Sequence, residues 1–498
     1  MEKLKFKQFL EKFINEQSKN IAETLSKLIR YKTVSGEDDI FFKYQTENSF
    51  LFLKEFAENN GLIFTKYNDD VATIDLGENF KNKYIGILCH LDVVPADDDG
   101  WTFPPFAGEI DQDGNIWGRG TIDDKGPLVS SLFAMIALKE FIKQENIELS
   151  KPIRMIIGTT EETGEWFDIK NFFNNRKPPE FSIVPDSNFP IISGEKGMLN
   201  ISISSTYPEQ RHPYIEIVSG TRSNIVPDLA KVKINVNQNA YENFLNQIDH
   251  HITNFLKNNP KSKINIIDKN NNAFSILIEF IGKSAHGSLP HEGHNALLDA
   301  LKFIVESEIL HDTSRQLLFA KFILEKCEDM YGTGLAINKK HDFLGDLTIN
   351  PGVLKMDNKK SELTINIRQV IGISIDEIKN KINELTEKHS KEFRIDFKTE
   401  ILGEALDPLY VDADKFSEFI DPLKESYEEF TGKNATLISI GGTTYAKAVP
   451  LGVSFGPVFT EGGEKELMHQ KDEHVSLESL KRNAKIYGYS LALLSIKE

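Results

Sequence analysis

The chain has 498 residues, enough for about three domains of ordinary size and for hydrophobic cores that need no disulfide or metal to fold. Its composition, with 40% hydrophobic, 27% charged and 10% aromatic residues, is typical of globular proteins and excludes a collagen-like or disordered chain. The formal net charge of −17 repels nucleic-acid phosphates and anionic lipids, so we expect neither nucleic acid nor a membrane as a partner.

The N-terminal segment is charged throughout and lacks the apolar centre that a secretory signal requires. Its apolar residues recur at helical spacing and predict an amphipathic helix through Phe6, Phe9, Leu10 and Phe13. No apolar stretch approaches the roughly 18 residues that a membrane helix needs. The two cysteines, Cys89 and Cys327, do not suggest a disulfide framework and favour a reducing compartment. We therefore expect a cytoplasmic protein.

Three continuous apolar runs follow, at residues 84–88, 153–158 and 181–184, and each is typical of a strand buried on both faces of a parallel sheet. Between the first two runs, Pro127 stands where the first turn of a helix tolerates proline, and apolar residues follow it at helical spacing. This alternation of strand and helix predicts an α/β domain whose mostly parallel sheet is covered by helices on both faces.

The pattern changes near residue 195. From there to about residue 400, apolar and polar residues alternate, which predicts half-exposed antiparallel strands at 199–204, 231–236, 274–280 and 362–368. An amphipathic helix is predicted from Ala296 to Val305, and the polar segment 256–273 is expected to be a loop or hairpin. These features indicate an α+β domain.

Beyond residue 400 the α/β pattern returns, with a predicted strand at 436–440 and a terminal helix. The apolar face of that helix is formed by Leu480, Ala484, Tyr487, Leu491 and Leu494. The simplest organisation is one α/β domain built from both ends of the chain, residues 1–194 and 400–498. An α+β lid domain, residues 195–399, would be inserted between them.

Polar residues gather where the predicted strands end. His90 and Asp92 follow the first strand, and residues two apart in an extended chain face the same side, so the Asp92 carboxylate can hold the His90 ring as it would behind a metal. Asp123 and Asp124 lie in a glycine-rich turn directly before the next helix. Each pair also has a simpler interpretation, as a structural histidine beside a cap or as acids that cap a helix.

The later strands end in the same way. Glu161 and Glu162 follow the second strand and Asp186 follows the third, at the edge where open α/β sheets bind ligands, and His469 lies in a glycine-rich loop before the terminal helix. Taken singly, these could be solvated charges, a turn residue and a surface histidine. Two distant histidines and acids from three successive segments together favour a site for two divalent cations, which share one carboxylate and leave room for a bridging hydroxide.

The same residues match a known pattern. His90-x-Asp92, the glycine-rich turn that ends in Asp123-Asp124-Lys-Gly, Glu161-Glu162 and Asp186 resemble the di-zinc peptidase family of carboxypeptidase G, succinyl-diaminopimelate desuccinylase, aminoacylase and carnosinase. The resemblance covers nearly the whole chain. By overall length and by the segments WTFPPFAGEI and WGRGTIDDKGP, the chain looks most like the PepV-type bacterial dipeptidases, the Xaa-His dipeptidases. It extends to segments 221–228 and 284–296 and to the His469 loop.

The resemblance implies a set of metal ligands. Asp123 would bridge two divalent metal ions, with His90 and Asp186 completing one ion and Glu162 and His469 completing the other. The ions would be zinc, although two imidazoles and several carboxylates also suit manganese or cobalt.

The resemblance also implies how the site works. Glu161 would be the general base, Asp92 would be the partner behind His90, and the Asp123–Asp124 peptide would be cis. Glu161 would take a proton from the attacking water and return it to the leaving amine.

Substrate groups are implied in the inserted domain. His286 matches a histidine that reaches the active site and steadies the oxyanion, and Asn224 and Arg368 resemble residues that bind the carboxylate end of the substrate. A turn near the end of the chain offers backbone N–H groups suited to an anion, at Gly441, Gly442 and Thr443. A strand-end arginine and a plain loop remain alternative interpretations of Arg368 and of this turn.

The expected function is the hydrolysis of small dipeptides with free N- and C-termini by a monomeric, metal-dependent enzyme. The alternative on the same scaffold is an N-acyl amino acid deacylase or desuccinylase. The resemblance favours the dipeptidase, because aspartate at position 186 accompanies amino- and dipeptidase activity in the family, whereas glutamate accompanies carboxypeptidases and deacylases. A metal-binding protein without turnover is a third hypothesis, and it leaves Glu161 beside Glu162 unexplained.

Overall fold

The computed structural model describes residues 2–36, 38–97 and 99–496. The chain forms two compact units, the first from residues 1–194 and 409–498 and the second from residues 195–408. Residues 400–408, which the sequence pattern placed in the first domain, belong to the second unit. The reason is that strand β19 (Lys398–Leu406) pairs with β10 (Met198–Thr206) in the sheet of that unit.

The first unit is built on a mixed sheet with parallel strands at its centre. Its strands are β1 (Ile63–Lys66), β2 (Ala72–Leu76), β3 (Ile85–His90), β6 (Ile153–Gly158), β7 (Phe181–Val184), β9 (Ile191–Glu195), β20 (Leu409–Tyr410), β21 (Leu437–Ile440) and β22 (Gly452–Ser454). The order is β1-β2-β6-β3-β7-β22-β9-β20, with β21 paired to β9. Strands β6, β3, β7 and β22 run parallel, which brings their carboxyl ends to one edge.

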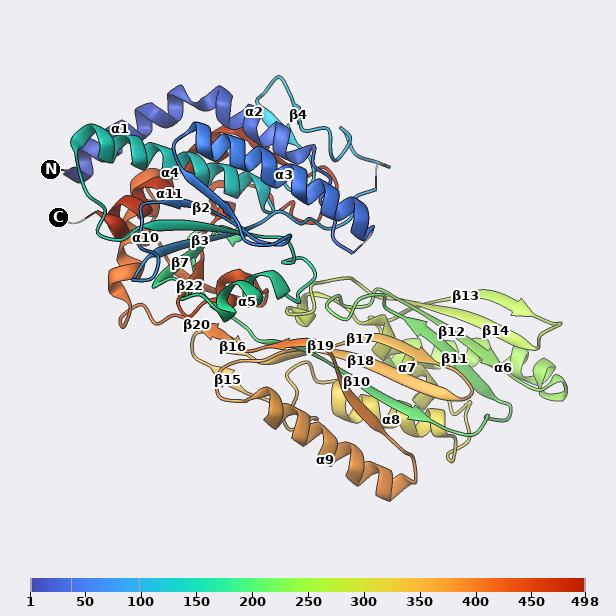
Figure 1. Cartoon of the computed structure of the whole chain (residues 1–498). Helices are drawn as coiled ribbons and strands as arrows, with labels where there is room; N and C mark the ends of the chain where they lie inside the picture. Colours follow the sequence, from blue (N-terminus) through green and yellow to red (C-terminus); the bar gives the residue numbers. More distant parts are fainter. Residues whose placement is uncertain (1, 37, 98, 497–498) are drawn as a thin grey trace. The chain divides into compact units, whose positions relative to one another are not determined.

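Helices cover both faces of this sheet (Figure 1). On one face, α4 (Lys125–Glu145) and α11 (Leu477–Ser495) pack against each other and against β3. Further helices pack around this pair or at the sheet edge: α1 (Glu2–Glu16), α2 (Ser18–Ile29), α3 (Asp39–Asn59) and α10 (Ser417–Thr431). The short helix α5 (Phe167–Asn174) lies on the other face, and the short helix η2 (Tyr445–Ala448) packs against β3, β7 and β22.

The alternation of side chains along β3 explains this arrangement. Ile85, Ile87 and Cys89 belong to the apolar core beneath α4 and α11. His90 points to the opposite face, where its ring lies edge-on to the ring of Tyr445, with 6.2 Å between the centroids. The predicted strands at 84–88, 153–158 and 181–184 are confirmed as β3, β6 and β7, and α11 buries the predicted apolar face.

The second unit is an antiparallel sheet with helices packed on one face. Its strands follow the order β13-β14-β12-β11-β17-β18-β10-β19. Besides β10 and β19, they are β11 (Tyr214–Ser219), β12 (Leu229–Asn235), β13 (Lys263–Asn270), β14 (Ser275–Ile281), β17 (Thr348–Met356) and β18 (Lys360–Arg368). Its helices are α6 (Gln238–Asn258), α7 (Ala296–Glu306), α8 (Arg315–Cys327) and α9 (Ile375–Phe393).

The polar segment 256–273 is only partly the loop or hairpin that was predicted. Helix α6 continues to Asn258, and strand β13 then forms a hairpin with β14. β13 is an edge strand with mostly exposed side chains, so its sequence lacks the apolar alternation that marks a half-buried strand.

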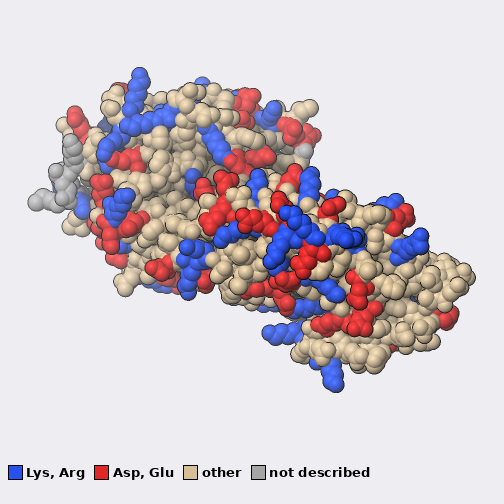
Figure 2. Space-filling view, turned by 90° about the horizontal axis from the view of Figure 1, so that it is seen from below, with Lys and Arg blue, Asp and Glu red and all other residues tan. Residues whose placement is uncertain are grey.

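Short strands complete the fold. β24 (His474–Ser476), β5 (Asn115–Trp117) and β4 (Glu109–Ile110) form one small sheet, β8 (Ser187–Asn188) pairs with β23 (Pro457–Val458), and β15 (Lys340–His341) pairs with β16 (Gly345–Asp346). Basic and acidic side chains are interleaved over the face drawn in Figure 2. Within the described residues, every helix is too short or too polar to cross a bilayer.

Candidate metal centre

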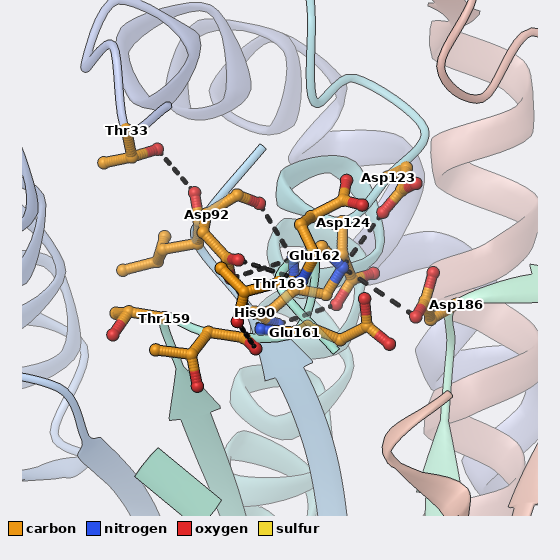
Figure 3. A network of polar contacts seen from close by, with 12 residues as sticks. Thr33, His90, Asp92, Asp123, Asp124, Thr159, Glu161, Glu162, Thr163 and Asp186 are labelled. Carbon is orange, nitrogen blue, oxygen red and sulfur yellow. Dashed lines mark hydrogen bonds and ion pairs between the residues drawn. The ribbon is translucent and has the colours of Figure 1, made fainter. Parts of the chain in front are cut away.

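A histidine and several acids from distant segments converge at the carboxyl ends of the central strands (Figure 3). His90 is the last residue of β3, and Asp186 follows β7. Glu161 and Glu162 lie in the loop after β6, and Asp123 lies in the turn that leads into α4. His469 joins them from the loop before α11, as its contacts show.

The potential ligand atoms form two groups. One contains His90, Glu161 and Asp186, the other contains Asp123, Glu162 and His469, and within each group all ligand atoms lie within 4.8 Å of one another. The resemblance assigned Glu161 to proton transfer alone. The geometry places its carboxylate within ligand reach as well.

Asp123 lies between the two groups. Its Oδ1 is 2.9 Å from Nε2 of His90, and its Oδ2 is 3.0 Å from Nε2 of His469. The His469 nitrogen is also 3.1 Å from Oε2 of Glu162, and the His90 nitrogen is 3.8 Å from Oδ2 of Asp186. One carboxylate therefore contacts both imidazoles, as a shared ligand of two cations would.

The donor atoms fit divalent cations. Among the described residues, Oε1 of Glu162 is a buried atom without a hydrogen-bond partner, and Nε2 of His90 and Oδ1 of Asp123 face each other at 2.9 Å. All three belong to the two ligand groups, and imidazole nitrogen with carboxylate oxygen is a set that zinc accepts. Buried polar atoms are normally paired, so the Glu162 oxygen points to a cation as its missing partner.

The acids at this site need positive charge. Burial, with the nearby charge of Asp186, raises the pKa of Glu161 well above its usual range. Burial and the charge of Asp123 raise the pKa of Glu162 to about 7 and that of Asp186 to about 6. The His469 side chain is 54% exposed, so desolvation opposes its charged form only in part, and its contacts with Asp123 and Glu162 raise its pKa to about 11. Without metal, protons supply the charge that cations would bring.

Asp92 lies behind the His90 ring and also holds the loop of Glu161 and Glu162. Nδ1 of His90 lies 2.8 Å from the backbone carbonyl oxygen of Asp92 and 3.4 Å from its carboxylate. The carboxylate accepts the backbone N–H groups of Glu161, at 3.2 Å, and Glu162, at 3.0 Å. The carbonyl can only accept, so it favours a proton on Nδ1 and directs Nε2 towards the ligand groups.

The second aspartate of the turn connects two elements. The Asp123–Asp124 peptide is cis, which confirms what the resemblance implied. Oδ2 of Asp124 accepts the backbone N–H of His90 at 3.1 Å. This bond ties the start of α4 to the end of β3.

A buried glutamate that the sequence analysis did not single out organises the same turn. Oε1 of Glu473 accepts the backbone N–H groups of Gly120 at 3.1 Å, Ile122 at 2.8 Å and Asp123 at 3.3 Å. Its Oε2 pairs with Nη1 of Arg119 at 2.6 Å. In the sequence, Glu473 is one acid in a polar loop, and its place directly before a short strand is the only local signal.

Asp168 organises the loop after β6 in a similar way, by accepting hydrogen bonds from its backbone. Its Oδ2 accepts the backbone N–H groups of Thr159 at 2.6 Å and Thr160 at 3.0 Å, together with the Tyr445 hydroxyl. The predicted anion-binding turn, Gly441 to Thr443, leads into η2, which carries Tyr445. The sequence analysis missed Asp168, which stands in a helix like many solvated acids.

The predicted substrate residues of the second unit also lie in paired segments. Ile225 forms an isolated bridge with His286, and the Gly287 N–H donates to the Asn224 carbonyl at 2.7 Å. Arg368 ends β18, is 2% exposed, and has its pKa lowered to about 10 by burial. The Asn224 and His286 loops are thus neighbours within this unit.

Comparison with known proteins agrees with this geometry. The family model described as Peptidase family M20/M25/M40 matches residues 86–492. Two bacterial relatives carry the name "Putative dipeptidase". YtjP of Bacillus subtilis (strain 168) is 34% identical over 451 residues, which cover 88% of each chain. A protein of Staphylococcus saprophyticus is 30% identical over 499 residues, which cover 97% of this chain and 99% of the other.

A solved structure shares the fold. The crystal structure of human carnosine dipeptidase 1 has a TM-score of 0.57 at 14% identity and covers 98% of both chains. The family match spans most of the chain, and the strand ends carry the converging histidines and acids described above. The chain therefore belongs to peptidase family M20/M25/M40 and is a peptidase.

Proposed function

We propose that this peptidase is a metal-dependent dipeptidase that hydrolyses small dipeptides with free N- and C-termini. The observation that carries the proposal is the position of Asp123, whose two oxygens contact one imidazole from each ligand group. The dipeptidase names of its bacterial relatives support the substrate class.

Two divalent ions would be held by the ligand groups. Asp123 would be shared, with His90 and Asp186 on one ion and Glu162 and His469 on the other. Bound ions of this kind polarise the scissile carbonyl and lower the pKa of water. Zinc suits the donors best, and manganese and cobalt also suit them.

Glu161 is proposed as the general base. It would accept a proton from the attacking water and pass it to the leaving amine nitrogen. Its buried carboxylate keeps a high pKa while the site holds only protons and acids. Cationic charge beside it favours the ionised carboxylate and lowers that pKa, which suits a group that must accept a proton.

His286, Asn224 and Arg368 are proposed to act on the substrate. Nδ1 of His286 accepts the Ser288 N–H at 3.3 Å, which favours a proton on Nε2. That Nε2–H is suited to donate to the developing oxyanion. Arg368 and Asn224 would bind the carboxylate end, and the turn of Gly441, Gly442 and Thr443 would offer N–H groups to an anion.

The test compares substrates on protein of defined metal content. The purified chain is stripped with a chelator and reloaded with zinc, manganese or cobalt. It is then assayed on β-alanyl-histidine and other free dipeptides, and on N-acetyl and N-succinyl amino acids. We expect metal-restored cleavage of the dipeptides. Faster cleavage of the acylated amino acids would establish the deacylase alternative instead, and a metal-loaded protein inert towards all of them would support a site without turnover.

We further propose that the enzyme is monomeric and cytoplasmic. Both cysteines, Cys89 and Cys327, are described, and both are buried free thiols, as is common in a reducing compartment. Light scattering tests the oligomeric state, and a stable dimer would contradict it.

A further inference from the structure

We propose that a row of three asparagines in the second unit holds Arg368 and the loop of Asn224 in a fixed position relative to each other. The row thereby sets how tightly the enzyme binds the carboxylate end of its substrate. This inference rests on the proposed function for its consequence, but its structural part stands on contacts within the second unit alone.

The three asparagines lie side by side on neighbouring strands. Asn366 of β18 is directly opposite Asn200 of β10 and also directly opposite Asn350 of β17. Asn366 and Asn350 are fully buried. The row faces away from the helices, because the alternate residues of these strands belong to the apolar core: Leu199, Ile201, Ile349, Ile365 and Ile367.

The middle residue of the row holds Arg368. The Nε–H of Arg368 donates to Oδ1 of Asn366 at 2.9 Å. Nδ2 of Asn366 then donates to Oδ1 of Asn200 at 2.8 Å, and the hydroxyl of Ser223 donates to the same oxygen at 2.9 Å. A continuous path of hydrogen bonds therefore runs from the guanidinium to the residue directly before Asn224.

The end of the row at Asn350 holds the Asn224 loop. Nδ2 of Asn350 donates to the carbonyl of Ser223 at 2.8 Å and to that of Ile225 at 2.9 Å, so it grips the backbone on both sides of Asn224. The Asn224 carbonyl in turn accepts the Gly287 N–H, beside His286. These hydrogen bonds thus hold the Asn224 loop and the His286 loop, which are far apart in the sequence, at a fixed distance from each other.

A second set of hydrogen bonds joins the same face of the sheet to the His286 loop. Thr348 of β17 lies directly opposite Arg368. Its hydroxyl donates to the carbonyl of Ser288 at 3.1 Å, and the hydroxyl of Ser288 lies 2.6 Å from Nδ1 of His286. Two adjacent rows of the sheet therefore support all three proposed substrate residues.

The direction of the bonds follows from the arginine. A guanidinium can only donate, so Asn366 must turn its oxygen to Arg368 and its NH2 group to Asn200. A buried amide that lacks hydrogen bonds destabilises a fold. Apolar residues of similar size would fill the same space in the sheet without that cost. The geometry thus points to orientation of Arg368, rather than packing, as the task of the row.

The test replaces Asn366 with leucine and compares each dipeptide with its C-terminal amide. For Asn366→Leu we expect kcat/KM on the free acid to fall about 10- to 100-fold, mainly through KM, since hydrogen bonds to charged groups have effects of this size. The amide lacks the carboxylate and should change less than about 3-fold. The matched control is Thr364→Val, on the same strand and face but opposite Ser202, and it should behave like the wild type.

Hydrogen exchange gives a second measurement that needs no activity. We expect faster exchange of the Gly287 amide and of segment 222–226 in Asn366→Leu and in Asn350→Ala, but not in Thr364→Val. If Asn366→Leu does not fold, Asn200→Ala replaces it, because Asn200 is linked to Arg368 through Asn366. It should shift the ratio of free acid to amide in the same direction.

The outcomes separate the two proposals. Equal losses on acid and amide, with unchanged exchange in both loops, would overturn the positioning role. A wild-type protein that cleaves neither substrate would remove the proposed function, and exchange would then decide alone whether the asparagines hold these loops together.

Discussion

In the first unit, the residues that converge at the strand ends are charged and come from segments spread over most of the chain. In the second unit, the polar row consists of neutral amides on three neighbouring strands. The acids of the first site repel one another and lack partners for several buried atoms. In the second, Asn366 bonds to Asn200 and to Arg368, while Asn350 donates to two backbone carbonyls.

This difference in charge indicates which of the two sites depends on bound cations or protons. A cluster of buried carboxylates is stable only when cations or protons neutralise it. A row of neutral amides carries no net charge and needs neither. We therefore expect the first site to respond to chelation, pH and charge-changing substitutions, and the second to respond to substitutions that alter shape.

Removing the shared acid should give the largest effect. Asp123→Asn weakens both ligand groups at once, so we expect activity to fall by about 10⁴-fold or more, with loss of bound metal measured by elemental analysis. Asp113→Asn, at an exposed turn, is the control and should keep both. Wild-type metal content in Asp123→Asn would contradict the shared-ligand interpretation.

Removing the proposed base should separate chemistry from metal binding. Glu161→Gln should lower kcat by about 10³-fold, the usual contribution of a general base, while the metal content stays unchanged. The exposed Glu165→Gln in the same loop is the control. Because Glu161 lies within ligand reach, a variant that loses metal would instead make it a ligand.

A smaller effect is expected from the glutamate beneath the turn. Glu473→Gln keeps an oxygen for the backbone N–H groups but removes the charge that faces Arg119. We expect metal affinity to fall about 10- to 100-fold, as for other residues that orient ligands, with a modest loss of thermal stability. Competition with a fluorescent chelator measures the affinity. Glu466→Gln, exposed in the His469 loop, should leave it unchanged.

The metal-free protein should be pH-sensitive in a defined direction. The pKa values of Asp186 and Glu162 are raised to about 6 and about 7, so the stability from their protonated forms is full near pH 4 and lost as the pH rises through these values. The raised pKa of His469 acts in the same direction. Scanning fluorimetry of chelated protein should show a Tm that falls by several degrees between pH 5 and pH 8.

Added zinc should raise that Tm more at pH 8 than at pH 5, because protons compete with metal for the carboxylates. Asn366→Leu should leave both pH profiles unchanged in shape. A Tm that rises with pH after chelation would show that the acids are neutralised in another way.

The sequence predicted the strands that position the site, because their apolar runs are local and continuous. It also predicted that His90, Asp123, Glu162 and Asp186 gather at one edge, since the carboxyl ends of parallel strands meet there. It did not predict the bonds of Asp92 to the Glu161 loop or the role of Glu473. Those bonds join a side chain to a distant backbone, and no local pattern encodes such a partner.

The edge strand β13 and residues 400–408 were misjudged for a related reason. An exposed edge strand can be polar on both faces, and a strand that pairs with a distant partner carries no mark of the unit to which it belongs. The roles within the ligand set came from the family resemblance rather than from spacing, and they remain proposals.

The sheet of the first unit places β22, from near the end of the chain, between β7 and β9. During synthesis, the earlier strands and acids emerge from the ribosome long before residues 452–454 and His469 exist. A nascent or truncated chain therefore has no finished sheet and no second imidazole for its acids. Dipeptide cleavage by the proposed ligand set therefore requires a chain synthesised at least as far as His469.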